Sequence, residues 1–218
     1  MLLYFGIMSG TSLDGLDICL TTIDNDIQLL DSCYLEFPPA LRQELLSLCQ
    51  PADNELVRMS VAEQQWAQLA AQGIHTILKR QKLTPKQIRA TGSHGQTIRH
   101  HPELGFSVQV GAPALLAELT DIPVVTHFRQ RDLAAAGQGA PLVPAFHQWL
   151  FEKLGHPSAI LNIGGFSNIS FVTPGQPVTG FDCGPGNVLL DAWITRHQGT
   201  NYDKDGDWAR SGRLCQSL

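Results

Sequence analysis

The sequence predicts an α/β protein on three grounds. Short apolar runs typical of strands alternate with segments of helical periodicity along the chain. Hydrophobic residues make up 43% of the chain and charged residues only 16%, which supports a buried core and excludes a disordered, charge-solvated polypeptide. The 218 residues allow one large domain or two small ones, because domains usually run about 100–150 residues.

Charge and cysteine usage exclude several classes of function. The net charge is -5 and no segment concentrates Lys and Arg. The sequence therefore lacks the cluster of basic residues with which a protein binds the phosphate backbone of a nucleic acid. The five cysteines include no CxxC pair, which argues against a zinc site or a disulfide framework and favours a reducing compartment. No stretch approaches the ~18–20 apolar residues of a membrane helix, and the apolar N-terminus lacks the basic start of a secretory signal. We therefore expect a soluble, cytoplasmic protein.

The first half of the chain predicts a hairpin followed by a long helix. Leu2–Ile7 and Leu16–Ile23 have strand character and are joined by a turn of Gly, Ser, Thr and Asp. Apolar residues recur at helical spacing from Asn54 to Arg80, which predicts a long amphipathic helix with one buried face. The shorter expected elements are strands over Ile88–Gly92, Phe106–Val110 and Ile122–Thr126, and a helix over Pro113–Leu119.

The second half of the chain predicts a further strand–turn–strand. The stretch Phe128–Pro144 is dense in Gly, Arg, Asp and Pro and cannot be regular throughout, so we place a domain boundary there. The expected domains are residues 1–144 and 145–218. The elements expected in the second are a helix over Ala145–Leu154, strands over Ala159–Ile163, Asn168–Val172 and Val178–Phe181, and a helix over Asn187–His197.

Two glycine-containing turns are candidates for binding phosphate, one between residues 10 and 15 and one at Gly164-Gly165. Turns of this composition expose backbone N–H groups that can surround phosphate oxygens. The first turn has the glycine spacing of a P-loop, but Leu16 stands where the Lys is required, which excludes a Walker-type NTPase. A tight structural hairpin is the alternative, and a chance similarity between the two turns is equally compatible with the pattern.

Asp182 and a charged loop are the other candidates. Asp182 follows an apolar strand and precedes a glycine-rich turn into a helix, where active sites of α/β folds usually lie. A helix-capping role fits the same spacing equally well. Arg129, Arg131 and Asp132 suit either an anion clamp or a surface ion-pair network. No set of metal ligands can be identified from the sequence.

Five ordered motifs cover the chain. They are Met8-Ser9-Gly10-Thr11-Ser12-Leu13-Asp14-Gly15-Leu16-Asp17, Gly92-Ser93-His94-Gly95-Gln96-Thr97, Phe128-Arg129-Gln130-Arg131-Asp132 with Gly137-Gln138-Gly139-Ala140-Pro141-Leu142-Val143-Pro144, Leu161-Asn162-Ile163-Gly164-Gly165-Phe166-Ser167-Asn168, and Phe181-Asp182-Cys183-Gly184-Pro185-Gly186-Asn187. Together they closely resemble the motifs of the anhydro-N-acetylmuramic acid kinases. The resemblance implies the actin/hexokinase/Hsp70-type ATPase architecture, with two related α/β domains around a nucleotide cleft and one phosphate-binding turn in each.

The resemblance also implies a reaction and a set of site residues. ATP and water would convert 1,6-anhydro-N-acetylmuramic acid to N-acetylmuramic acid 6-phosphate during peptidoglycan recycling, with Mg²⁺ as the accompanying ion and a small amino sugar as the partner. Separately from the resemblance, we expect a homodimer. Asp182 matches the family's general base, Asp14 would lie near the Mg²⁺ shell, and Arg131 suits the lactyl carboxylate of the sugar. The positions that match nucleotide-binding residues are Gly10, Thr11, Ser12, Leu13, Asp14, Gly15, Leu16, Asp17, Gly164, Gly165 and Asn168. Those that match substrate-side loops are Gln96, Thr97 and Arg131.

The length of the chain departs from the family. Members of the family are considerably longer, and this sequence stops inside their second domain, so we expect an incomplete second domain without the family's adenosine-binding segment. Two other functions therefore stay open at the level of the sequence. One is an inactive, sugar-binding remnant of such a kinase, and the other is a different phosphotransferase on the same fold.

Overall fold

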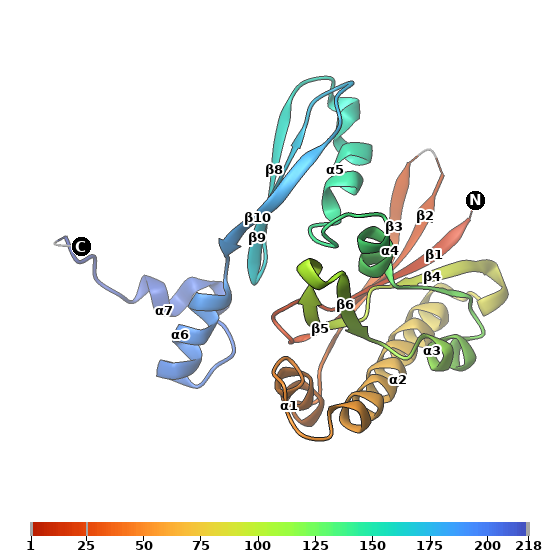
Figure 1. Cartoon of the computed structure of the whole chain (residues 1–218), viewed down its shortest axis with the longest axis horizontal. Helices are drawn as coiled ribbons and strands as arrows, with labels where there is room; N and C mark the ends of the chain where they lie inside the picture. Colours follow the sequence, from red (N-terminus) through yellow and green to blue (C-terminus); the bar gives the residue numbers. More distant parts are fainter. Residues whose placement is uncertain (1, 25, 217–218) are drawn as a thin grey trace. The chain divides into compact units, whose positions relative to one another are not determined.

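The computed structural model describes residues 2–24 and 26–216, and the chain divides into two compact units, Met1–Gly139 and Ala140–Leu218 (Figure 1). The elements of the first unit are β1 (Leu3–Met8), β2 (Gly15–Ile23), β3 (Ile27–Glu36), α1 (Pro39–Ser47), α2 (Glu55–Gln81), β4 (Ile88–Ser93), β5 (Gln96–His101), β6 (Phe106–Val110), α3 (Pro113–Thr120), β7 (Val124–Val125) and α4 (Phe128–Ala134). Those of the second are α5 (Val143–Phe151), β8 (Ser158–Ile163), β9 (Phe166–Val172), β10 (Thr179–Pro185), α6 (Val188–Gln198) and α7 (Asp207–Arg210).

The first unit is built on a mixed five-stranded sheet in the order β3-β2-β1-β4-β7. The hairpin β1–β2 and the next strand β3 pair antiparallel, whereas β4 runs parallel to β1 and β7 parallel to β4. Strands β5 and β6 form a separate antiparallel pair. Because β1 ends beside the end of its parallel neighbour β4, the turn after β1 and the loop after β4 meet at one edge of the sheet.

The core of the first unit lies between this sheet and α2. Alternate residues of β1 and β2 point to the helix, and α2 presents an apolar face at helical spacing. The largest fully buried side chains shared by these elements are Phe5, Leu16, Ile18, Leu20, Trp66, Ile74 and Ile77. Burial of each side chain of this size removes its apolar surface from water and contributes roughly 1.5–3 kcal/mol to the stability of the folded state.

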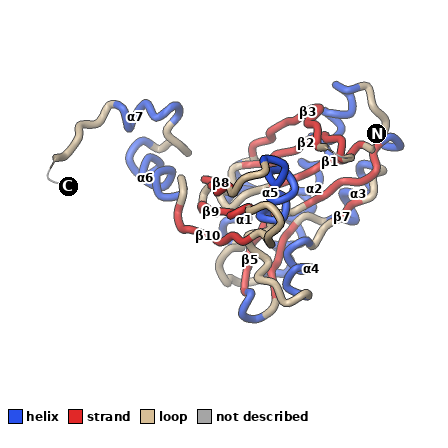
Figure 2. The backbone as a smooth tube through the Cα atoms, turned by 90° about the horizontal axis from the view of Figure 1, so that it is seen from above, coloured by secondary structure: helices blue, strands red, loops and turns tan. Residues whose placement is uncertain are grey.

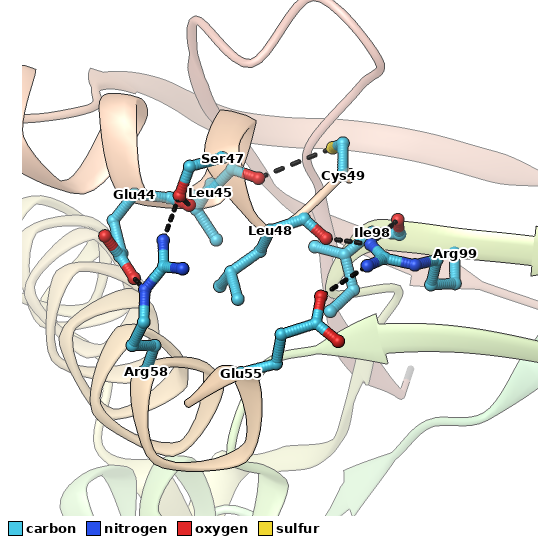
Figure 3. A network of polar contacts seen from close by, with 9 residues as sticks. All are labelled: Glu44, Leu45, Ser47, Leu48, Cys49, Glu55, Arg58, Ile98 and Arg99. Atoms are coloured by element: carbon cyan, nitrogen blue, oxygen red, sulfur yellow. Dashed lines mark hydrogen bonds and ion pairs between the residues drawn. The ribbon is translucent and has the colours of Figure 1, made fainter. Parts of the chain in front are cut away.

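Two arginines tie α1, α2 and β5 together (Figure 3). Arg58 in α2 forms an ion pair with Glu44 of α1, at 2.7 Å between Nε and Oε1. Arg99 of β5 donates to the carbonyl oxygen of Leu48 and forms an ion pair with Glu55, the first residue of α2. This anchorage holds the β5–β6 pair against the helical layer.

The second unit contains a three-stranded antiparallel sheet in the order β8-β9-β10, with α5 alongside it (Figure 2). One contact fixes the helix against the sheet: His147 of α5 lies 2.9 Å from the hydroxyl of Ser170 in β9, measured from Nδ1 to Oγ. Gly180 of β10 allows the close approach, because a Cβ there would lie 2.7 Å from Cγ of Pro144. The sheet thus packs one face against α5.

Most elements expected from the sequence are present, and several others were missed. The predicted hairpin, long helix and second strand–turn–strand are confirmed within one or two residues at most ends. The strands β3 and β5 and the helices α1, α4 and α7 were not predicted. Strand β3 is an edge strand with most side chains half-exposed or exposed, and β5 is rich in polar residues, so neither shows the apolar pattern of a buried strand. The strand predicted over Val178–Phe181 was too short, since β10 continues through Asp182 to Pro185.

Candidate active site

The turn between β1 and β2 carries the first group of predicted nucleotide-binding residues. Leu13 has a positive φ of 54° and its side chain is buried, so burial stabilises a backbone conformation that a leucine rarely adopts. Arg42 holds the turn by donating from Nε to the carbonyl oxygen of Leu13 at 2.9 Å. No acceptor among the described residues takes the backbone N–H groups of Thr11 and Ser12. The turn therefore presents adjacent amide donors, the arrangement that suits phosphate oxygens.

A buried chain of hydrogen bonds joins this turn to the loop after β4. Trp66 of α2 donates from Nε1 to the Ser9 hydroxyl at 3.3 Å, and that hydroxyl donates to the carbonyl oxygen of Gly95 at 3.1 Å. Gln96 adds a second connection, because its Nε2 donates to the carbonyl oxygen of Gly10 at 3.1 Å. Two regions 86 residues apart in the sequence are thus joined, and the structure brings Gln96 to the turn that is predicted to bind nucleotide.

Gly95 is required at its position in this loop. Its φ is +74°, and a Cβ would lie 2.5 Å from the carbonyl oxygen of Val110. Only glycine adopts this conformation without strain and leaves room for the neighbouring strand.

Two carboxylates lie close together at the start of β2. The pKa of Asp17 is raised above its ordinary value because neighbouring protein atoms partly desolvate the carboxyl and, secondarily, because Asp14 places a negative charge nearby. The Ser12 hydroxyl donates to Asp14 Oδ1 at 2.8 Å and orients that carboxylate. A divalent cation would relieve the repulsion between the two carboxylates, so these oxygen donors suit a hard divalent cation such as Mg²⁺.

His94 and Arg129 form a second interaction in the same region. Arg129 Nε donates to His94 Nε2 at 2.9 Å, and His94 Nδ1 lies 2.7 Å from the carbonyl oxygen of Gly95. The imidazole is therefore neutral with its hydrogen on Nδ1. Consistently, burial and then the charge of Arg129 lower the pKa of His94. Arg129 also donates from a terminal NH₂ group to the carbonyl oxygen of Gly139 at 2.7 Å, so it connects the loop after β4 to the loop after α4.

The predicted substrate residues Thr97 and Arg131 lie in different environments. Thr97 is half-buried in β5 and accepts a hydrogen bond from Gln109 Nε2 at 3.2 Å. Arg131 is exposed on α4, and the structure gives its guanidinium no hydrogen bond to Gln96 or Thr97. Asp132 accepts from the backbone N–H of Gly139 at 2.8 Å, so this carboxylate supports the following loop.

The second unit holds the other predicted turn. The carbonyl oxygens of Gly164 and Gly165 accept from the backbone N–H groups of Asn187 and Gly186, at 2.9 and 2.8 Å. A Cβ at Gly186 would lie 2.0 Å from the oxygen of Gly164, so glycine is the residue that allows this approach. Backbone hydrogen bonds thus join the turn between β8 and β9 to the connection from β10 to α6.

Asp182 belongs to a row of polar residues across the three-stranded sheet. The strand register places Asp182 of β10 opposite Asn168 of β9, and Asn168 opposite Asn162 of β8. Residues that face one another across antiparallel strands project from the same face of a sheet. The Asp182 carboxyl is exposed, and Oδ1 of Asn168 is buried without a donor among the described residues. Asp182 caps no helix, because it lies inside a strand.

The described part of the chain contains no group of three or more His, Cys, Asp or Glu side chains suited to hold a metal ion. It also contains no helix that is long and apolar enough to cross a membrane. A hollow of about 150 Å³ opens beside the arginine network of Figure 3 and is lined mainly by apolar side chains of α2, β5 and β6. None of the residues predicted as site residues lines it.

Comparison with known proteins identifies the family. A profile of the anhydro-N-acetylmuramic acid kinases matches residues 2–218. Proteins named anhydro-N-acetylmuramic acid kinase are 59% identical in Pseudomonas fluorescens, over 100% of this chain, and 61% identical in Pseudomonas putida, over 97% of it. The chain belongs to the anhydro-N-acetylmuramic acid kinase family. The resemblance seen in the sequence is thereby confirmed. The chain spans 60% of the length of the Pseudomonas fluorescens relative and 58% of the length of the Pseudomonas putida relative.

Membership of the family agrees with the fold. A solved structure of a reductive activator for a corrinoid, iron–sulfur protein matches 85% of this chain and 31% of its own, with a TM-score of 0.54 at 13% identity. The α/β class and the actin/hexokinase/Hsp70-type ATPase fold expected from the sequence are confirmed.

Sequence reasoning missed residues that act through side-chain pairing. Gln109 was not singled out, because a lone glutamine in a strand carries no motif. His94 and Arg129 lie in recognised motifs, but their contact joins residues 35 positions apart and has no signal in the spacing. Trp66 falls on the predicted buried face of the long helix, and its hydrogen bond to Ser9 depends on how that helix lies on the sheet.

Proposed function

We propose that the protein carrying this sequence is an ATP-dependent kinase that converts 1,6-anhydro-N-acetylmuramic acid and water to N-acetylmuramic acid 6-phosphate. Membership of the family over residues 2–218 is the observation that carries the proposal. The reaction belongs to the recycling of peptidoglycan, in the cytoplasm, and its partner is a small amino sugar. A homodimer stays a prediction from the sequence.

The phosphate donor is proposed to bind the two glycine turns. No acceptor among the described residues takes the amide hydrogens of Thr11 and Ser12, which supports a role for the turn of residues 10–17 in holding phosphate oxygens. Gly164, Gly165 and Asn168 are proposed as the corresponding group of the second unit. When bound, Mg²⁺ would neutralise phosphate charge, with Asp14 and Asp17 as its proposed carboxylate partners.

Asp182 is proposed as the general base. An exposed carboxylate on the edge strand of a sheet can accept the proton of a water molecule as that water attacks the anomeric carbon. The anomeric carbon–O6 bond breaks, and the released O6 attacks the γ-phosphorus of ATP, with ADP as the leaving group. Gln96, Thr97 and Arg131 are proposed to orient the sugar, with Arg131 pairing with its lactyl carboxylate.

The test is an isotope experiment with the intact protein that carries this sequence. In water enriched in oxygen-18, the label should appear in the anomeric hydroxyl of the product and not in its phosphate. Product is quenched early and analysed by mass spectrometry, because slow ring opening exchanges the anomeric oxygen. Label in the phosphate, or no phosphorylated sugar at all, would overturn the proposal.

A further inference from the structure

Gln109 lies directly opposite Thr97 in the β5–β6 pair and is fixed by two hydroxyl groups. The strand register pairs the two residues, and Gln109 Nε2 donates to Thr97 Oγ1 at 3.2 Å. The same nitrogen donates to the Ser107 hydroxyl oxygen at 2.6 Å. Both hydrogens of the side-chain amide are therefore used, and they hold the amide in one orientation.

The surroundings of Ser107 support this orientation. The Ser107 hydroxyl donates to the carbonyl oxygen of Arg99 at 3.3 Å, so its oxygen is left to accept from Gln109. His100 Nδ1 lies 3.0 Å from the same oxygen. The backbone carbonyl of Ser107 accepts from Gln130 Nε2 at 3.0 Å, which braces the strand from α4. The amide oxygen of Gln109 is buried and accepts no hydrogen bond from the described residues. Burying an unpaired acceptor costs free energy, and an amide that could rotate would turn this oxygen toward water. The buried oxygen therefore indicates that the amide is held in place.

This orientation decides what the Thr97 hydroxyl can do. Because Gln109 donates to Thr97 Oγ1, the hydroxyl hydrogen points elsewhere, and no acceptor among the described residues takes it. Thr97 is only half-buried, so a ligand can reach it. A hydroxyl held in this way acts as a donor and selects an acceptor oxygen, such as a carbonyl, ether or carboxylate oxygen.

We propose that Gln109 is a positioning residue that holds the Thr97 hydroxyl as a hydrogen-bond donor to an acceptor oxygen of the sugar. The inference rests on the proposed function, which makes the anhydro-sugar the ligand of this loop. The inference assigns a role to Gln109, which lies outside the five motifs. It also makes Thr97 the donor of the hydrogen bond to the sugar.

The test reverses the hydrogen bond without changing its shape. In Gln109→Glu a carboxylate, which only accepts, draws the Thr97 hydrogen toward itself and removes the donor from the sugar. We expect Gln109→Glu and Thr97→Val each to raise the Kd for the anhydro-sugar about tenfold, the effect of one hydrogen bond. The double variant should lose no more than either single one, because both remove the same interaction. KM should rise while kcat at saturating sugar changes less than about threefold.

Further variants separate positioning from a structural role. Gln109→Met removes the amide without adding charge and leaves the Thr97 hydroxyl unoriented. It should therefore weaken binding of the anhydro-sugar by about threefold. This variant tests the proposal if Gln109→Glu does not fold. Thr97→Ser should bind like the wild type. Gln130→Met is the matched control, since Gln130 braces the same strand without contacting Thr97, and its Kd should stay within about twofold.

Two outcomes would overturn the inference in distinguishable ways. Wild-type sugar affinity in both Gln109 variants, or additive losses in the double variant, overturns the positioning role and leaves the proposed function intact. A wild-type protein that does not bind the anhydro-sugar overturns both.

Discussion

Asp182 stands in a strand with its carboxyl exposed, one member of a polar row that includes Asn168 and Asn162. In the intact protein, Asp182→Asn keeps the shape of the side chain but removes its basicity. We expect kcat to fall by about 10²–10⁴-fold, at the larger end because water attack and phosphoryl transfer depend on the same step. The Kd for the anhydro-sugar should remain close to wild type, since an amide still hydrogen-bonds to hydroxyl groups.

The matched control is Asp207→Asn, at an exposed carboxylate of α7 that forms a surface ion pair with Arg210. This change should alter neither kcat nor Kd. Near-normal turnover in Asp182→Asn would rule out the general base, and lost sugar binding with normal kcat at saturation would make Asp182 a binding residue.

His94 should make the stability of the fold depend on pH. Burial and the charge of Arg129 lower the pKa of His94 below its ordinary value of 6.5, so the unfolded chain takes up this proton first on acidification. The stability that neutral His94 contributes is present above pH 6.5 and is lost as pH falls toward the lowered pKa of the native state. Between about pH 8 and about pH 5, the Tm of the wild type should therefore fall by about 2–4 °C more than that of His94→Gln.

The control for this experiment is His75→Gln, an exposed histidine of α2. It should leave the difference in Tm between the two pH values as in the wild type. Burial also lowers the pKa of His147. This histidine is present in every protein compared, so its contribution to the pH dependence of Tm cancels. Equal falls in Tm in wild type and His94→Gln would contradict the prediction.

At the scale of elements, the contact between α2 and the sheet depends on a glycine inside the helix. A Cβ at Gly73 would lie 2.2 Å from Cδ1 of Ile18 in β2, and Ile18 is only 1% exposed and has no room to move. Gly73→Ala should therefore lower the free energy of unfolding by about 1 kcal/mol, because the cost of overpacking exceeds the gain in helix propensity of about 1 kcal/mol.

The same change should reverse its sign when the opposing side chain is shortened. Ile18→Val removes Cδ1, the atom that the new methyl group meets. In the Ile18→Val background, Gly73→Ala should raise the free energy of unfolding by up to about 1 kcal/mol. Urea unfolding of the four proteins measures this coupling, and equal destabilisation by Gly73→Ala in both backgrounds would disprove the packing argument.

At the scale of the whole molecule, one face of the second unit's sheet carries exposed apolar side chains. The register puts Leu161 and Phe181 in one row, and Ile163 follows two residues after Leu161 on the same face. Leu161 is 55% exposed, Phe181 56% and Ile163 66%. Exposed apolar patches of this kind favour association. The 218-residue polypeptide should therefore associate with increasing concentration, as measured by sedimentation velocity.

A charge on this face should suppress the association. Leu161→Lys places an ammonium group in the middle of the patch and should shift the polypeptide toward monomer. Leu104→Lys is the matched control, because Leu104 is 69% exposed but belongs to the first unit and not to this sheet. A concentration-independent monomer in the wild type, or equal effects of the two lysines, would contradict the prediction.

The sequence by itself determined the α/β class, most elements and the family. These features are encoded locally or in ordered motifs: the periodicity of α2 predicts its buried face, and five separated motifs identify the family without any geometry. The strands β3 and β5 escaped prediction because an exposed edge and a polar hairpin lack the apolar alternation on which strand prediction depends.

Only the tertiary structure decided which side chains meet. The bonds from Trp66 to Ser9, from Gln96 to Gly10 and from Arg129 to His94 join residues 35 to 86 positions apart. The pairing of Gln109 with Thr97 depends on a strand register that no composition reveals. Such contacts arise from how α2 packs on the sheet and how the strand ends adjoin. A hydrogen bond's direction requires both partners in place, so the donor role of Thr97 is a property of the fold and not of the sequence motif.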